Sequence, residues 1–159
     1  LYKHLPRCRG NPEDLEAFTQ CHLALVGVGF HGRGVHKGLS QVIGWQLGAY
    51  GVAHGHTSCV MLPHVMEFNR PVSLSSQAAL GRELGGGGTT DDALAEQAQA
   101  AVAGLVRDLD LPRRLRDVGI HREDLRDIAK KVIMSPNIIY NPRSVTDPEE
   151  VLTILKKAW

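Results

Sequence analysis

TSCVMLPHVMEF, from Thr57 to Phe68, is the segment on which the fold class depends. Its apolar residues fall on almost every side of a helix rather than along one stripe, which is typical of a helix buried in a core. Pro63 removes one backbone hydrogen bond from such a helix, at a cost of about 3 kcal/mol unless it lies in the first turn or at a kink. We therefore expect this helix to be part of the core.

Four flanking segments combine a helix start signal with apolar residues every three or four positions. They begin near Asn11-Pro12, Thr89-Thr90, His121 and Asp147. The residues expected to face inward are Leu15, Phe18, Cys21, Leu25 and Val28 in the first segment, Leu94, Ala98, Ala101, Leu105 and Leu109 in the second, Leu125, Ile128, Ala129 and Val132 in the third, and Val151, Ile154, Leu155 and Ala158 in the fourth.

The rest of the chain adds one more helical segment and a loop. Val35 to Tyr50 is predicted as a less amphipathic helix, and Gly85 to Gly88 as a flexible loop. No segment shows the alternation of a strand. The sequence thus predicts an all-α helical bundle, a single domain over residues 1–159, with Asn11 capping the helix that starts at Pro12. The helices starting near Pro12 and Thr90 are expected in the core.

Composition excludes several function classes. Eighteen Lys and Arg against 17 Asp and Glu give a net charge of +1, too weak a field for nucleic acid, and 5% aromatic residues suit no base-stacking surface. The longest apolar or glycine run, Leu23 to Phe30, is far shorter than the roughly 20 residues of a membrane span. Three cysteines without a CxxC spacing favour a reducing, cytoplasmic setting. The first residues show no leader pattern and suggest an interior cut of a longer polypeptide.

Histidines are the first indication of chemistry. The chain has eight, and six of them lie between His22 and His64. His54-Gly55-His56 places two imidazoles close together, but a tight metal site needs at least three ligands, and no HExxH or CxxC motif supplies them. For His22, His31 and His64, a surface position or a hydrogen-bonded core position is the simpler interpretation. No GxSxG turn points to a serine nucleophile.

Three consecutive stretches carry a family resemblance: GLSQVIGWQLGA at 38–49, GVAHGHTSCVMLP at 51–63 and VMEFN at 65–69. They resemble the iron-containing (group III) alcohol dehydrogenase family. Flanking pieces, among them Leu5-Pro6, Leu111-Pro112, Asn141-Pro142-Arg143 and Ala158-Trp159, are similar to its maleylacetate reductase-like branch.

The resemblance implies the later part of the helical, dehydroquinate synthase-like C-terminal domain of a two-domain NAD(P)-dependent oxidoreductase. Substrate and metal would lie in the cleft between the domains. NAD or NADP would be bound mainly by an N-terminal α/β domain that these 159 residues lack, so we expect that domain as a partner, either a domain or a subunit. The chain alone is expected neither to bind NAD(P)H nor to be active.

Three residues fall on active-site positions of the family. A ligand histidine aligns with Gln41, a second active-site histidine aligns with Trp45, and only His54 retains the family residue. The resemblance thus implies His54 as the catalytic proton donor and the one metal-ligand position retained, with Gln41 and Trp45 binding a small-molecule substrate. The family's other two ligands are expected upstream of Leu1. Because an amide oxygen is a poorer ligand than imidazole for iron or zinc, tight metal binding is not expected.

Two other interpretations remain open. The chain could be a non-catalytic interaction or regulatory subunit in which the ligand positions have decayed, as Gln41 and Trp45 suggest; plain helix packing would also explain those two residues. An unrelated helical bundle with a His-rich metal site is disfavoured by the match from His54 to Asn69.

Overall fold

Helices and short 3-10 turns form all the regular secondary structure of residues 1–159, the part of the chain that this computed structural model describes. No strand is present, so the predicted all-α fold is confirmed. The helices are α1 (Leu5–Gly10), α2 (Leu15–His31), α3 (Leu39–Ala49), α4 (His54–Glu83), α5 (Asp91–Asp108), α6 (Leu125–Ile133) and α7 (Pro148–Ala158), and the 3-10 turns are η1 (Leu115–Val118), η2 (Arg122–Asp124) and η3 (Pro136–Tyr140).

Helix α4 contains the segment that decides the fold and is much longer than predicted. It bends at Ser73, where φ is −130° and ψ is 21°. Pro63 lies well before this bend, inside the helix. The Gln77 side chain spans the bend, because its amide nitrogen donates to the Met66 carbonyl at 2.8 Å and to the Ser73 hydroxyl at 2.9 Å. The expected burial on every side is only partly right, since Leu62 is 38% exposed.

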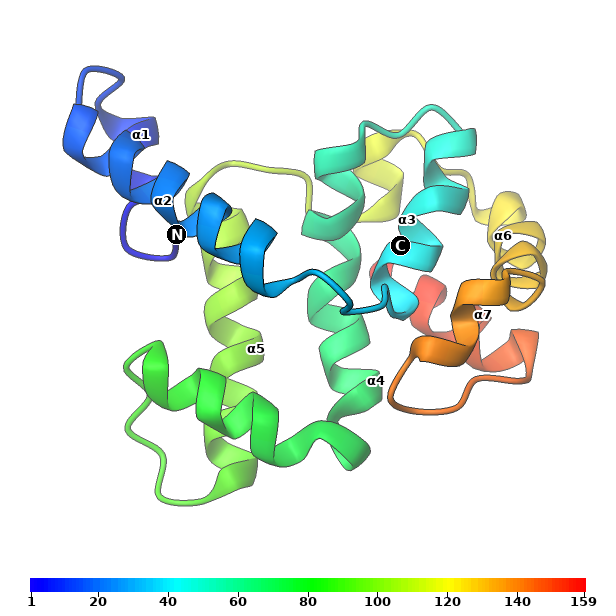
Figure 1. Cartoon of the computed structure of the whole chain (residues 1–159). Helices are drawn as coiled ribbons and strands as arrows, with labels where there is room; N and C mark the ends of the chain where they lie inside the picture. Colours follow the sequence, from blue (N-terminus) through cyan, green and yellow to red (C-terminus); the bar gives the residue numbers. More distant parts are fainter.

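The main core lies where α3, α4, α6 and α7 meet (Figure 1). All eight inward-facing residues predicted for α6 and α7 are buried. Asp147 caps α7 by accepting a hydrogen bond from the Glu149 amide at 2.8 Å. The buried residues of this cluster are Leu39, Val42, Ile43, Leu47, Val52, Val60, Met61, Val65, Leu115, Ile120, Leu125, Ile128, Ala129, Val132, Ile138, Val145, Val151, Leu152, Ile154, Leu155 and Ala158.

Helix α5 packs along α4 but outside this main core. Thr90 caps it as predicted, accepting from the Ala93 amide at 3.2 Å. Gly81 of α4 has no room for a side chain, because a Cβ there would overlap the Leu94 backbone. Of the predicted stripe, Leu94 and Ala98 are buried. The helix from Thr90 therefore contributes buried residues to the core, as expected, but it does so through an extensive contact with α4 rather than as part of the main cluster.

Helices α1 and α2 form an arm at one side of the molecule, away from α6 and α7 (Figure 1). Helix α2 buries only Ala17 and Cys21. Three residues of the predicted inward stripe, Leu15, Leu25 and Val28, are exposed, Leu15 to 76%. The core assignment of this helix is wrong, because periodicity predicts an amphipathic helix but does not supply the surface that covers it.

The start of α2 also differs from the prediction. Asp14, not Asn11, is the N-cap and accepts from the Ala17 amide at 3.0 Å. The Asn11 side chain instead accepts from the Glu13 amide at 3.1 Å, and so forms a local turn before the helix. The short helix α1, which precedes this turn, was not predicted from the sequence.

Candidate functional site

The junction of α3 with the first turn of α4 brings the three predicted site residues into one region. Gln41 and Trp45 lie one turn apart on the same face of α3, and Gly44 lies beside them. A Cβ on Gly44 would lie 2.8 Å from Thr57 Oγ1, so only glycine lets α3 approach α4 this closely. The buried Thr57 hydroxyl in turn donates to the His54 carbonyl at 2.7 Å. Packing at Gly44 thus places the turn that carries His54 next to α3.

A reciprocal pair of buried amides fixes the start of α3. Asn69 Nδ2 donates to Asn141 Oδ1 at 3.0 Å, and Asn141 Nδ2 donates to Asn69 Oδ1 at 2.8 Å. Asn141 Oδ1 also accepts from the Leu39 amide at 3.1 Å, and Asn141 Nδ2 also donates to the Arg143 carbonyl at 2.8 Å. The side chain of Asn141 therefore links α4, α3 and the segment before α7, and its contact with α3 lies two residues before Gln41.

Gln41 lines a shallow groove of about 320 Å³ beside this amide pair. The groove runs along the segment that leads into α3, and residues of α4 form its other side. Its lining residues are Val35, His36, Lys37, Gly38, Leu39, Ser40, Gln41, Leu62, Val65, Asn69, Asn141 and Pro142. Half-buried Gln41 can offer both an amide donor and an acceptor to a small molecule in this groove.

Trp45 and His54 lie on the surface rather than in a cavity. Trp45 is 41% exposed, and His54, the first residue of α4, is exposed as well. Neither residue lines any of the five cavities. A Cβ on Gly55, the residue after His54, would meet nothing within 4 Å, so no contact within this chain requires a glycine there.

The side chains present do not form a metal-binding set. No group of three or more His, Cys, Asp or Glu side chains is arranged to hold an ion. Of the predicted ligand positions, His54 offers one imidazole and Gln41 one amide oxygen. Zinc and iron sites in proteins are built from at least three protein ligands, usually imidazole, thiolate or carboxylate. The residues of this chain alone therefore do not fit iron or zinc.

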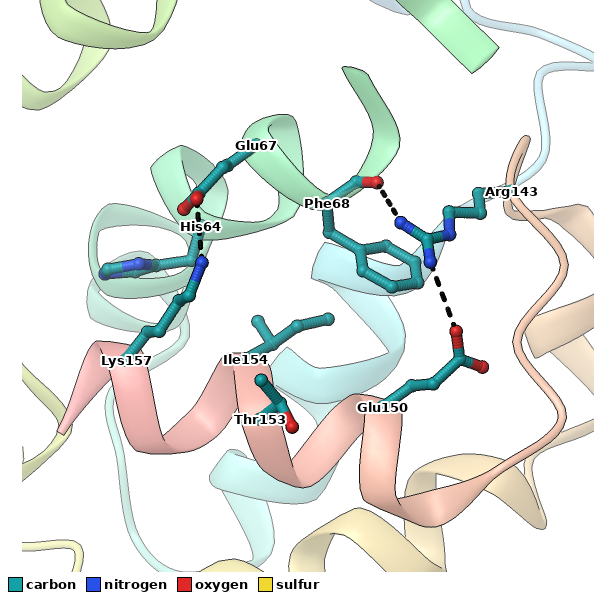
Figure 2. A pocket seen from close by; sticks show the side chains of 8 residues that line it. All are labelled: His64, Glu67, Phe68, Arg143, Glu150, Thr153, Ile154 and Lys157. Atoms are coloured by element: carbon teal, nitrogen blue, oxygen red, sulfur yellow. Dashed lines mark hydrogen bonds and ion pairs between the residues drawn. The ribbon is translucent and has the colours of Figure 1, made fainter. Parts of the chain in front are cut away.

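A second groove of about 360 Å³ lies between α4 and α7, and its rim is charged (Figure 2). Lys157 Nζ lies 2.7 Å from Glu67 Oε1. Arg143 donates to the Phe68 carbonyl at 3.0 Å and lies 3.4 Å from Glu150 Oε1. Each cation thus already has a carboxylate partner. Lys157 joins α7 to α4 directly, and Arg143 connects both helices through Glu150 and the Phe68 carbonyl.

His64 forms one wall of this groove and also borders the cavity between α4 and α5. Burial lowers the pKa of its imidazole below the ordinary value; the nearby Glu67 raises the pKa and Lys157 lowers it further. The neutral form of His64 is thus favoured in the folded protein. His64 is half-buried and has no side-chain hydrogen bond, so it is neither the surface residue nor the hydrogen-bonded core residue that the sequence suggested.

Comparison with known proteins identifies the family. Residues 1–159 match the model of the Fe-containing alcohol dehydrogenase family, C-terminal. The chain belongs to this family. A 1,3-propanediol dehydrogenase from Klebsiella pneumoniae is 32% identical over 139 residues, which are 85% of this chain and 35% of that protein. An NAD-dependent methanol dehydrogenase from Bacillus methanolicus is 30% identical over 163 residues, covering 99% of this chain and 42% of that protein.

Solved structures agree with this assignment. The alcohol dehydrogenase from Oenococcus oeni superimposes with a TM-score of 0.93 at 25% identity, over 99% of this chain and 42% of that protein. A 1,3-propanediol oxidoreductase gives a TM-score of 0.73 at 30% identity, over 77% of this chain and 32% of that protein. The chain thus spans about a third to two fifths of the length of these relatives. No helix in it is both long enough and apolar enough to cross a membrane.

Sequence reasoning missed the amide pair, although both residues stood in motifs that carried the resemblance. Asn69 closes the VMEFN stretch and Asn141 opens the Asn-Pro-Arg stretch. The sequence contains both asparagines in separate motifs, and only the fold shows that their side chains form hydrogen bonds with each other. Polar residues buried in an apolar core require partners, so a search for two such residues could have suggested the pair.

Proposed function

We propose that this chain is the substrate side of an NAD(P)-dependent alcohol dehydrogenase or carbonyl reductase. The observation that carries the proposal is the α3–α4 junction, in which Gly44 allows the turn of His54 to lie against the helix of Gln41 and Trp45. Together with a facing unit, this exposed surface would form one side of a cleft that holds a small alcohol or carbonyl compound. We further propose that the protein belongs to the maleylacetate reductase-like branch of the family and that it works in the cytoplasm.

The cofactor would be bound mainly by a second unit. A dinucleotide pyrophosphate is typically held where a strand leads into a helix through a glycine-rich turn, and this chain contains no strand. We therefore infer that an α/β nucleotide-binding domain or subunit docks across the His54 side. The nicotinamide would supply or accept the hydride.

The exposed face of α2 supports the need for a further part of the subunit. Leu23, Val26 and Phe30 lie with Leu15 on one face, and Phe30 is 71% exposed. A fully buried side chain of this type contributes about 1.5–3 kcal/mol, so α2 forgoes a substantial stabilisation while it is uncovered. We propose that the rest of an iron-containing alcohol dehydrogenase subunit covers this face, since the relatives are more than twice as long.

Residue roles follow from the chemistry of each side chain. As hydride reaches the carbonyl carbon, the carbonyl oxygen requires a proton, and His54 can donate one; the reverse step removes the proton from an alcohol. Gln41 and Trp45 can donate hydrogen bonds that orient the oxygen, but neither can relay a proton. Because the donor set does not fit iron or zinc, no step is assigned to a metal.

The test replaces His54 in the active assembly of this chain with its nucleotide-binding unit. General acid catalysis is typically worth about 10²–10⁴ in rate, so His54→Ala should lower kcat at least about tenfold with little change in stability. His22→Ala is the matched control, because His22 lies exposed on α2 with Nδ1 2.8 Å from the Phe18 carbonyl oxygen. An unchanged kcat in His54→Ala would remove the catalytic role.

A second candidate function is a non-catalytic, regulatory or interaction subunit. It is favoured by Gln41 and Trp45, which replace histidines at two family positions. The two proposals differ in one measurement: the purified native particle should oxidise alcohols or reduce carbonyl compounds with NAD(P) under the first, and should lack this activity under the second.

A further inference from the structure

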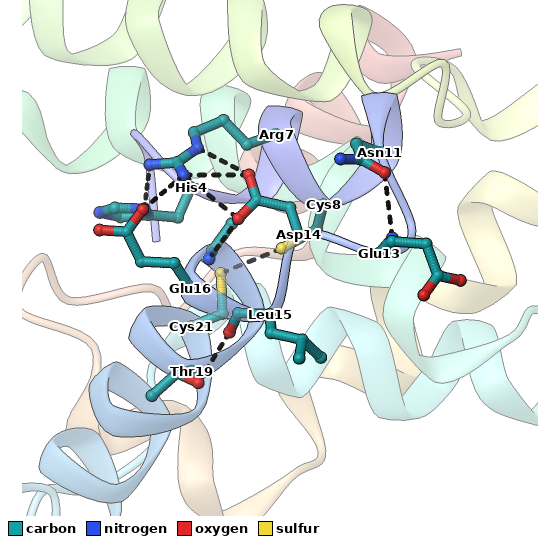
Figure 3. Close-up of polar contacts among 11 residues, drawn as sticks. His4, Arg7, Cys8, Asn11, Glu13, Asp14, Leu15, Glu16, Thr19 and Cys21 are labelled. Atoms are coloured by element: carbon teal, nitrogen blue, oxygen red, sulfur yellow. Dashed lines mark hydrogen bonds and ion pairs between the residues drawn. The ribbon is translucent and has the colours of Figure 1, made fainter.

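Two of the three cysteines meet where α1 packs on α2. Cys8 Sγ and Cys21 Sγ lie 3.9 Å apart, and Figure 3 shows the sulfurs facing each other between the two helices. Cys8 is half-buried and Cys21 is buried. We propose that this pair is an oxidative modification site, at which a peroxide converts the two thiols into a disulfide that links α1 to α2.

The surrounding ion pairs hold the two thiols in place (Figure 3). Arg7, next to Cys8, donates to Asp14 Oδ2 at 3.0 Å and to Glu16 Oε2 at 2.8 Å. Asp14 is also the N-cap of α2, the helix that carries Cys21. Arg7 therefore ties the last turn of α1 to the first turn of α2, and the positions of both cysteines are set by one cluster.

The remaining movement is small. A disulfide bond is about 2.05 Å long, so the sulfurs must approach each other by about 1.9 Å. Rotation about a Cα–Cβ bond can move a sulfur by this much. Cys59 is the contrasting case, because its thiol lies on α4 and donates to the Gly55 carbonyl at 3.2 Å, with no cysteine beside it.

The reaction balances in two steps. Cys8, the more accessible thiol, attacks one oxygen of hydrogen peroxide as the thiolate; the O–O bond breaks, leaving a sulfenic acid on Cys8 and one water. Cys21 then attacks the Cys8 sulfur, the S–O bond breaks, and the leaving hydroxide takes the proton of the Cys21 thiol as a second water. The thiols together lose two electrons and two protons, and the peroxide gains them.

Burial and the neighbouring Cys21 raise the pKa of Cys8, which lowers the fraction of thiolate. Attack on peroxide is accordingly slow, and the site responds to sustained oxidation rather than to a brief pulse. The link would close a loop from Cys8 to Cys21 and restrict the opening of an arm in which α2 buries only two residues.

The test treats the purified 159-residue chain with hydrogen peroxide, alkylates it under denaturing conditions and measures its intact mass. The oxidised chain should be lighter by two hydrogens and take up one alkyl group, whereas the reduced chain takes up three. Cys59→Ser should still form the link and then take up none. Cys8→Ser and Cys21→Ser should not form it, and a dithiol reductant should reverse it.

Hydrogen exchange supplies a second readout. Amides of α1 should exchange about tenfold more slowly in the oxidised chain, because the link suppresses local opening. Three remaining alkylation sites after oxidation would overturn the proposal. So would a disulfide that includes Cys59, a covalent dimer on a non-reducing gel, or sulfinic acid on Cys8 in place of the link.

Discussion

The buried amide pair of Asn69 and Asn141 should be the most sensitive polar contact in the molecule. Asn141→Ala removes every bond of that side chain: the two exchanged with Asn69, the one accepted from the Leu39 amide and the one donated to the Arg143 carbonyl. The Leu39 amide and both polar atoms of Asn69 then remain buried without their partner.

The expected loss of stability follows from these buried polar groups that have lost their partners. Each buried donor or acceptor left unsatisfied costs about 1–3 kcal/mol, and three such groups would give well over 3 kcal/mol if no water reached them. Asn141 borders two grooves, so water can reach part of the site. We expect a loss of about 3 kcal/mol, a large share of the roughly 5–15 kcal/mol that stabilises an ordinary domain.

Urea unfolding followed by circular dichroism measures this loss. Asn137→Ala is the control, because Asn137 lies in turn η3, which directly precedes Asn141, but outside the amide pair, and it should change stability by less than about 0.5 kcal/mol. Asn69→Ala completes a double-mutant cycle in which the two effects should fall short of additivity by about 1 kcal/mol or more. A loss below about 1 kcal/mol in Asn141→Ala, or strict additivity, would refute the reasoning.

Three more outcomes are expected. In urea unfolding, Gly44→Ala should destabilise the chain by about 1–3 kcal/mol, because the added Cβ overlaps Thr57. Gly48→Ala is the control, because a Cβ there meets nothing, and it should be neutral or stabilising by up to about 1 kcal/mol. Equal effects of the two substitutions would contradict the packing at the α3–α4 junction. Because burial lowers the pKa of His64, the unfolded chain binds a proton first as the pH falls, so His64 stabilises the fold above its ordinary pKa of 6.5 and this contribution is lost below it. His64→Gln should flatten the dependence of unfolding free energy on pH in that range, and an unchanged slope would contradict this. Titration of the chain alone with NADH and NADPH should show no sub-millimolar affinity, and a fluorescence-detected affinity tighter than that would contradict the need for a nucleotide-binding unit.

Local signals predicted the second half of the fold well. Helices α6 and α7 have strong start signals and a regular apolar stripe, and both bury that stripe against α3 and α4. Asp147 caps α7 and Thr90 caps α5 through the side-chain bonds that their sequence positions predict. Here propensity, capping and periodicity agree with the packing, so each local signal is a sufficient guide.

The same signals failed for α2, and the reason is physical. Its apolar residues recur with helical spacing, which correctly gives a helix, but an apolar stripe becomes core only if another surface covers it. Leu15, Leu25 and Val28 meet no such surface in these 159 residues. Burial of a stripe is a property of the whole subunit, whereas its periodicity is a property of the segment.

The candidate site also combines features that this chain determines by itself with features that depend on a facing unit. Contacts within this chain determine its framework, because Gly44, Thr57 and the Asn69–Asn141 pair fix how α3 meets α4. They do not determine the working surface: Trp45 and His54 face outward, and Gly55 meets nothing that would require a glycine. Substitutions in the framework should therefore change stability in the isolated chain, whereas substitutions at His54 or Trp45 should become visible only when the facing unit is docked. Stability measurements on single variants test this difference between framework and working surface. A large loss of stability from His54→Ala in the isolated chain would show that His54 belongs to the framework instead.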